Sequence, residues 1–530
     1  MLAPMVMLPN AEALVDGATA CISLDGKNVV RVVAPPSLPP SLVRRAIQYG
    51  WSLGIAGESH LNGFHEFTLR GSPWVATDQF QPGHHTLLLL SIVRTLAQGG
   101  WRLAGSINTS KRLSAVDSLF FVRAEPRPRP VLFTVHMPSL DSVSLSGERA
   151  TGREADIQAA LRCAVARGWP GVVLRERFLG GFFTLTLDGS PWSGIVSCDA
   201  AVRALMLHMV RAFAEIGFGL AGVCSVWAEV GASEDGRMRL PVPDAWLFEL
   251  DGSDSTASVD SLPPALIPCG TPAGCGAMAA LTALGNSLLE IVAPPEIGKL
   301  VVDAISSNWD RGICSVESGR AIPADRARPT FVEPHPHSSP HDGAVTLVRL
   351  NGSPWCGSSE DAVKSRRLLL ALLARLRRGG WRLYAAPDAC LGNFATHPWL
   401  FERCKPMPAI DMCAVALADR RKLRLIHSAD ASCKEAASAA ADAISAAVAM
   451  VPGTSHRAAQ YCGAAEWTFG GVIWADEGKD TVWSHALIAN IIGAMQRAGF
   501  ELLTACRMSN KELQRDTLVF TRTFGPACGF

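Results

Sequence analysis

Gly71-Ser72-Pro73-Trp74 recurs as Gly189-Ser190-Pro191-Trp192 and as Gly352-Ser353-Pro354-Trp355, and the related Gly471-Val472-Ile473-Trp474 ends on a fourth tryptophan. We call these four tryptophans the anchors. Each anchor is followed 26 or 27 residues later by a second aromatic residue that glycine precedes, namely Trp101, Phe218, Trp381 and Phe500. A spacing that is kept four times is typical of an internal repeat. The sequence therefore predicts four tandem copies of a module of about 120 residues.

The segment before each second aromatic predicts an amphipathic helix. Residues 12, 9, 8 and 5 positions upstream are apolar in all copies, which is the spacing of one stripe on an α-helix. The stripe residues are Leu89, Ile92, Val93 and Leu96; Met206, Met209, Val210 and Phe213; Leu369, Leu372, Leu373 and Leu376; and Ile488, Ile491, Ile492 and Met495. We predict that the following glycine ends the helix in the left-handed conformation, at Gly100, Gly217, Gly380 and Gly499. An earlier helix is predicted to stop in the same way at Gly50, Gly168 and Asn308.

Alternation of apolar and polar residues predicts the strands of the module. Phe67, Thr68 and Leu69 alternate ahead of the first anchor, and the other copies keep this pattern, which is typical of a half-buried strand. Residues 21–24 and 29–33 flank a turn and predict a hairpin, as do residues 412–417 and 423–426. The predicted fold class is α+β, with four tandem copies of a two-layer α/β sandwich. In each copy two helices cover one face of a largely antiparallel sheet.

Landmark spacing and linker composition divide the chain into four predicted modules. They are residues 1–127, 128–256, 257–407 and 408–530, and the third carries a Pro- and His-rich insertion near 318–341. Copies one and three share Val-Ala-Pro-Pro (33–36 and 292–295) and Gly-Gly-Trp-Arg-Leu (99–103 and 379–383), whereas copies two and four do not. This pairing indicates that a two-module unit was itself duplicated.

The composition argues against a purely electrostatic partner. Lys plus Arg number 49 and Asp plus Glu number 48, so no field of one sign draws the chain to nucleic acid or to an anionic membrane. The first residues lack the basic region of a signal peptide, and no apolar run approaches the roughly 20 residues that span a bilayer. The 15 cysteines are scattered, which favours a reduced compartment and buried thiols. We expect a soluble, cytoplasmic protein and leave a nuclear location open.

A search for motifs that carry chemistry yields two weak candidates. No phosphate-binding loop, nucleophile elbow, His-Glu-x-x-His or paired Cys-x-x-Cys motif is present. His335, His337 and His341 could bind a metal, but a Pro- and Ser-rich loop gives ligands little support, so an exposed loop is favoured. The segment 269–276 lacks the strand and lysine of a phosphate site and is interpreted as a linker or turn. We therefore predict no catalytic, cofactor-binding or metal-binding residues, and no cofactor.

The most basic segment lies around the second helix of copy three, at residues 364–382. Its arginines are candidates for contact with an acidic or phosphate-bearing partner: Arg366, Arg367, Arg375, Arg377, Arg378 and Arg382. The alternative is an apolar stripe toward the core with an arginine face in water. Only here would nucleic acid or a lipid headgroup bind. A second repeated set, Asp117, Asp244 and Asp516 with His397 in copy three, is interpreted as capping the turn into the last strand rather than as a ligand site.

The anchors decide between a repeated core and a repeated binding platform. In copy four the loop before Trp474 has lost Ser and Pro while the tryptophan remains, which favours a role in the core. Core positions repeat and no polar constellation does, so we expect a soluble multi-module interaction or scaffold protein without catalytic activity, whose partner is a protein. The alternatives are an enzyme or small-molecule-binding protein with a site in an inter-module cleft, and recruitment to an acidic or phosphate-bearing surface through residues 364–382.

Overall fold

The protein is described from a computed structural model. It describes residues 15, 17–61, 64–74, 83–108, 116–193, 199–225, 245–250, 277–319, 344–356, 359–387, 398–407, 410–428, 434–451, 455–474, 481–508 and 517–522. The predicted sites at residues 335–341 and 269–276, and Asp244, His397 and Asp516, lie outside these ranges.

All four modules follow the order strand, strand, helix, strand, strand, helix, strand, strand. Module 1 comprises β1 (Thr19–Asp25), β2 (Val29–Val33), α1 (Pro40–Gly50), β3 (Ile55–Leu61), β4 (Phe64–Leu69), α2 (His84–Gln98), β5 (Trp101–Ile107) and β6 (Ser118–Arg123). Module 2 comprises β7 (Leu132–Ser139), β8 (Ser142–Ser146), α3 (Glu154–Gly168), β9 (Val173–Leu179), β10 (Phe182–Leu187), α4 (Asp199–Glu215), β11 (Phe218–Cys224) and β12 (Ala245–Leu250).

The second half of the chain repeats this order. Module 3 comprises β13 (Met278–Leu284), β14 (Leu288–Ala293), α5 (Pro295–Asn308), β15 (Ile313–Gly319), β16 (Ala344–Leu350), α6 (Ser359–Arg378), β17 (Trp381–Ala385) and β18 (Trp399–Arg403). Module 4 comprises β19 (Met412–Ala418), β20 (Lys422–His427), α7 (Lys434–Ala449), β21 (His456–Tyr461), β22 (Ala464–Phe469), α8 (Thr481–Arg497), β23 (Phe500–Cys506) and β24 (Thr517–Arg522).

Each module forms one six-stranded antiparallel sheet, and the strand order is the same in all four. In module 1 the order is β3-β4-β2-β1-β6-β5, so β3 lies at one edge and β5 at the other. The two helices of the module pack together, as α1 with α2 and α3 with α4. The predicted α+β module with two helices and an antiparallel sheet, present four times, is therefore confirmed.

The repeated core positions behave as the spacing predicts. Every residue of the helix stripes is buried, at 5% exposure or less. All four anchors are buried as well, and the Nε1 of Trp74 donates to the carbonyl of Val29 at the start of β2 (3.2 Å). Trp192 and Trp474 donate to the equivalent carbonyls of Ser142 and Lys422. All four anchors thus lie in the core, as predicted, and three of them also bond the loop to the sheet.

The glycine stops are confirmed for the second helix and wrong for the first. Gly100, Gly217, Gly380 and Gly499 all have φ between 80 and 85°. Gly50, Gly168 and Asn308 are instead ordinary last residues of α1, α3 and α5. A Cβ on Gly50 would lie 2.8 Å from the Leu88 Cα of α2, and one on Gly168 would lie 2.7 Å from the Leu205 Cα of α4. These glycines therefore serve close helix packing, which a sequence pattern cannot separate from a stop signal.

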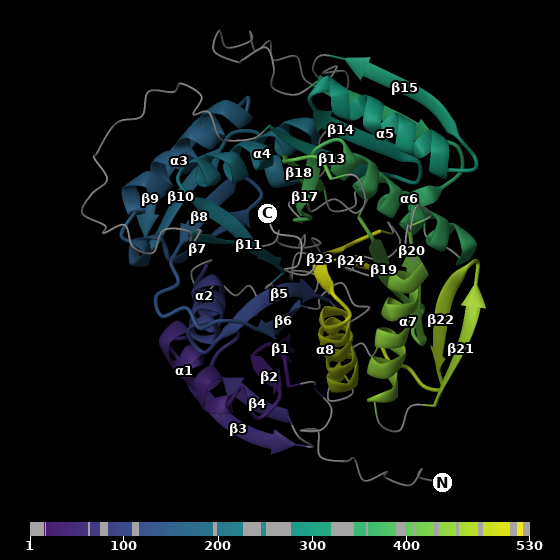
Figure 1. Ribbon diagram of the computed structural model, residues 1–530. Coiled ribbons are helices and arrows are strands. Elements are labelled where there is room, and N and C mark those ends of the chain that lie inside the picture. The colour runs from purple at the N-terminus through teal and green to yellow at the C-terminus, as the bar shows by residue number, and fades with distance from the viewer. Residues whose placement is uncertain are drawn as a thin grey trace, which may run out of the picture.

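The second face of each sheet is covered by a helix of the preceding module in the ring. The second helix of one module packs on the following sheet, as α2 on β7, α4 on β13 and β14, and α6 on β19 and β20. The last helix, α8, packs on β1, β2 and β6 of module 1. The four modules therefore close into a ring, in which yellow α8 lies against the purple first strands (Figure 1).

Side chains of one strand consequently enter two cores. Ala20, Ile22 and Leu24 of β1 belong to the core of module 1, whereas Cys21 belongs to the core built around α8. Alternation with a period of two makes this division possible. Each second helix is buried on two sides, which explains why nearly all of α8 is inaccessible to water.

The inner edge strands β5, β11, β17 and β23 lie around the middle of the ring (Figure 1). β5 contacts β11 and β23, and β11 also contacts β17. Each inner strand pairs with its neighbour through a register shift at one repeated place. At that shift a Cβ on Gly222 would lie 2.7 Å from the side chain of Leu103 in module 1, and one on Gly105 would lie 3.1 Å from Leu502 of module 4. A leucine of one module thus covers the bulge of the next.

Candidate functional site

The most conspicuous buried polar residues occupy one repeated position at the four module junctions. The residue 11 positions after each anchor is His85, Arg203, Arg366 or His485. All four are buried on the second helix, at 6% exposure or less. Because a buried polar group needs a partner, the contacts of this position show what each junction is made of.

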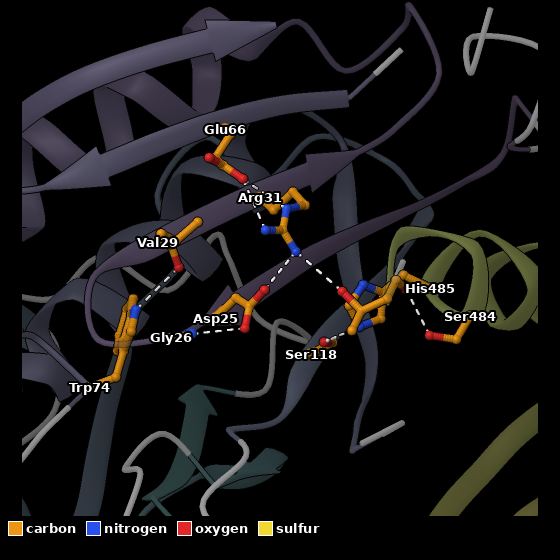
Figure 2. A network of polar contacts seen from close by, with 10 residues as sticks. Asp25, Gly26, Val29, Arg31, Glu66, Trp74, Ser118, Ser484 and His485 are labelled. Atoms are coloured by element: carbon orange, nitrogen blue, oxygen red, sulfur yellow. Dashed lines mark hydrogen bonds and ion pairs between the residues drawn. The ribbon is translucent and has the colours of Figure 1, made fainter. Parts of the chain in front are cut away.

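At the junction of modules 4 and 1, polar contacts close the ring. His485 Nε2 lies 2.9 Å from the Ser118 hydroxyl of β6. Arg31 of β2 donates to Thr481 of α8 (3.2 Å) and forms ion pairs with Asp25 (2.7 Å) and Glu66 (2.9 Å). Figure 2 shows the Arg31 guanidinium between the two carboxylates and α8. Burial lowers the pKa of His485 to about 3, and the charge of Arg31 contributes to this shift.

At the junction of modules 2 and 3, a buried ion pair joins the two modules. The Arg203 Nε donates to the Thr282 hydroxyl of β13 (2.6 Å), and its Nη1 pairs with Glu290 of β14. Their side chains are 1% and 8% exposed. Taking two charges out of water is costly, so such a pair adds little net stability even though it joins the two modules.

At the junction of modules 1 and 2, histidines and hydroxyl groups make the polar contacts described here, in place of the ion pairs found at the two junctions above. Thr86 of α2 donates to the Ser146 hydroxyl of β8 (2.9 Å), and His136 Nδ1 of β7 lies 3.4 Å from the same oxygen. The rings of His85 and His136 meet edge to face with centroids 6.1 Å apart. Burial lowers the pKa of both histidines to about 3, and the charge of His136 adds to the shift of His85. Both imidazoles are therefore neutral at pH 7.

The basic segment of module 3 is distributed over several contacts. Arg366 is 5% exposed and donates to the Thr517 hydroxyl of β24 (2.9 Å), at the junction of modules 3 and 4. Arg367 donates to the carbonyl of Cys462 in module 4 (2.6 Å). Two members of the predicted set thus hold α6 to the next module.

The other four arginines lie at the end of α6 and on β17. Arg375 pairs with Asp303 of α5 (3.1 Å), and Arg382 pairs with Glu402. Arg377 donates to the carbonyl of Lys405 (3.2 Å). Arg378 is exposed. The structure therefore does not gather the six side chains on one face of the helix.

Asp117 also joins two modules. It is 2% exposed, and its carboxylate accepts a hydrogen bond from the backbone N–H of Ser225 in module 2 (2.8 Å). This bond reaches the neighbouring module, and the cap of its own strand stays a prediction. Within the described part of the chain, no three His, Cys, Asp or Glu side chains are arranged to hold a metal ion. None of the described helices is long and apolar enough to cross a membrane.

The outer edge strands β3, β9, β15 and β21 lie on the periphery of the ring (Figure 1). Each is terminal in its sheet and pairs, among the described residues, with its hairpin partner alone. β9 is exposed at every residue, and β21 at all but its last. An edge of this kind presents a row of backbone N–H and C=O groups that can accept another strand.

Comparison with known proteins identifies the repeat independently. One model of a protein-domain family matches the chain four times, over residues 18–122, 133–247, 279–402 and 411–521. The chain belongs to this domain family. No curated protein and no solved structure matches it. The family assignment thus supports the fourfold repeat.

The junction residues were missed in the sequence, although a signal for them exists. The position 11 after each anchor shares polarity rather than identity, so the repeated apolar stripes do not include it. An alignment scored for polar residues inside an apolar helix would single it out. Arg31 and Glu290, which take part in two of the junctions, occupy one equivalent strand position and differ in charge, so no residue pattern marks them.

Proposed function

We propose that this protein is a multi-module interaction scaffold rather than an enzyme, and that its closed ring carries outward-facing edge strands. The observation that supports this proposal is the repetition of β3, β9, β15 and β21 as exposed edges on one periphery. Four junctions with apolar cores and buried polar contacts hold these edges in fixed positions. A frame of this kind can bind several protein segments at set distances by adding strands to its sheets.

Site-specific photo-crosslinking in the source cells tests the proposal. A photoreactive phenylalanine replaces Ser59, Arg177, Glu317 or Ala459, which are exposed and occupy one equivalent position on the four outer edges. We expect each variant to be cross-linked to defined proteins. The control places the same group at Tyr49 of α1, which is 80% exposed but lies on a helix.

Two outcomes would contradict the scaffold proposal. An absence of cross-linked protein at all four edges, or the same products at Tyr49, would exclude the scaffold proposal. A variant at Arg378 separates the remaining alternative, because cross-links confined to that residue would indicate recruitment through the basic segment.

A further inference from the structure

Strand β9 of module 2 differs from the other three outer edges in its apolar content. Among the described residues, nine large hydrophobic side chains are exposed, and five of them lie in β9 or directly before it. They are Val172, Val173, Leu174, Phe178 and Leu179, with exposed fractions from 42% to 63%. The equivalent strands carry small or polar residues at most positions, as in Arg457-Ala-Ala-Gln460 of β21. Exposed apolar side chains that gather in one place mark interaction sites.

The charges of β9 divide between its two faces. Glu176 faces α3, where it pairs with Arg162 (2.5 Å). Phe178 lies on the same face, and the guanidinium carbon of Arg149 is 3.8 Å from its ring centroid. Since alternate residues of a strand point to opposite faces, Arg175 and Arg177 lie together on the other face. Both are exposed.

This arrangement disfavours pairing with a second copy of the chain. In an antiparallel pair formed by two copies about a twofold axis, each face of one strand meets the same face of the other. Arg175 would then lie opposite itself, Arg177 or an apolar residue, and Glu176 would likewise find no basic residue. Like charges directly opposite are destabilising, and charged residues on an edge are a common defence against self-association. The central Arg175, Glu176 and Arg177 thus disfavour a second copy of the chain and favour a partner segment with acidic residues.

We propose that β9 is a docking strand for an extended segment of a partner protein that carries two acidic residues two positions apart, flanked by apolar residues. This inference rests on the proposed scaffold function and names the partner chemistry of one edge. The segment adds to β9 as an antiparallel strand, so that its acidic residues lie opposite Arg175 and Arg177. Its apolar residues lie opposite Phe178 and Leu179 at one end and Val173 and Leu174 at the other. Main-chain bonds provide affinity in this mode, and alternate side chains provide specificity.

Two synthetic peptides test the charge requirement on the full chain. The acidic peptide has the sequence Val-Leu-Glu-Lys-Glu-Phe-Leu between Gly-Ser flanks, and its control has Lys-Glu-Lys in the centre. With fluorescein labels and anisotropy as the measurement, we expect the acidic peptide to bind at least about tenfold more tightly, since two cross-strand pairs change from repulsive to attractive.

A charge-reversed variant supplies the sharper test. Arg175→Glu combined with Arg177→Glu should exchange the preference, so that the Lys-Glu-Lys peptide binds more tightly. Both residues are exposed, so the folded state should be retained, which circular dichroism and the melting temperature check. Arg457→Glu is the matched control, because Arg457 occupies the same position on β21 as Arg175 on β9. It should leave the binding of both peptides unchanged.

Three results would overturn the inference. The parent chain binds neither peptide, or it binds both equally, or it forms a concentration-dependent dimer in sedimentation velocity that the Arg175→Glu, Arg177→Glu variant abolishes. Failure here is separable from failure of the scaffold proposal. Cross-links that persist at Ser59, Glu317 and Ala459 without any peptide preference remove only this inference, whereas the absence of cross-links at all four edges removes the scaffold itself.

Discussion

At the scale of single residues, one repeated helix position carries a buried polar residue at all four module junctions, and its contacts differ from junction to junction. Position 11 after the anchor is a histidine next to module 1 and an arginine at the other two junctions. The ion pair of Arg203 and Glu290 is more deeply buried than the ion pairs of Arg31. A pair of this kind is costly to break, because the remaining partner keeps its charge in a dry environment.

We predict that Arg203→Met lowers the free energy of unfolding by about 3 to 5 kcal/mol. The double variant Arg203→Met, Glu290→Leu should recover most of this loss, since no charge then remains unpaired. Urea denaturation followed by tryptophan fluorescence measures both. Arg44→Met is the control, because Arg44 pairs with Glu58 at the surface, where the contact is worth less than about 1 kcal/mol. Equal losses for Arg203→Met and Arg44→Met would contradict the assignment.

At the scale of elements, the helices show what patterns in the sequence reveal and what they conceal. The stripes of α2 and its counterparts were predictable because spacing encodes one buried face. The face by which each of these helices packs on the sheet of the following module was not predictable, because an apolar residue in a helix does not show which sheet it contacts. Gly50 illustrates the same limit: its place at the end of a helix suggested a stop, and only the approach of Leu88 shows that space, not backbone conformation, requires a glycine.

Two helical glycines give a matched test. We predict that Gly50→Ala destabilises the protein by about 1 to 3 kcal/mol, because the new methyl group overlaps the backbone of α2. Gly298 lies inside α5, where a Cβ would meet its nearest neighbour, the Thr346 hydroxyl, at 3.5 Å. Gly298→Ala should therefore stabilise by about 0.5 to 1 kcal/mol through helix propensity. Thermal unfolding of the two variants should shift in opposite directions, and a stabilised Gly50→Ala would refute close packing at that site.

At the scale of the whole molecule, the ring was not predictable from the sequence. The repeat and the α+β fold of each copy follow from spacing, alternation and glycine positions. Closure depends on contacts between the first and last modules, such as Arg31 with Thr481, which are 450 residues apart. No pattern in either segment predicts its contact with the other segment. The docking strand was not predictable for a different reason: β9 mixes charged and apolar residues, and the sequence of a short strand does not show whether its apolar side chains are exposed or buried.

The ring should respond to acid unevenly. His85 and His136 line one border of module 1, and His485 lines the other. Their pKa values are about 3 when folded and about 6.5 when exposed. Stability is therefore complete above pH 6.5 and falls as the pH decreases toward 3, by about 1.4 kcal/mol per pH unit and histidine, because only the opened state binds the protons.

Buried thiols report this response at three junctions. Cys21 lies at the junction of modules 4 and 1, Cys224 at that of modules 1 and 2, and Cys506 at that of modules 3 and 4. We predict that lowering the pH from 7 to 5 increases the reaction of Cys21 and Cys224 with dithiodipyridine relative to Cys506. Rates are normalised to those of the urea-unfolded chain. A uniform increase at all three thiols would show that the histidines do not determine where the ring opens.

Closure of the ring also sets a condition on biosynthesis. The apolar face of module 1 that α8 covers, which includes Cys21, Val33 and Phe120, leaves the ribosome long before residues 481–497 are translated. At about 5 to 20 residues per second, a gap of 450 residues corresponds to roughly 20 to 90 s. During this interval one face of the module 1 sheet stays uncovered, because α8, which completes the core on that face, has not yet been synthesised. Module 1, although it is synthesised first of the four, is thus the last to be completed, and a chaperone that shields this face would protect the protein until α8 is synthesised.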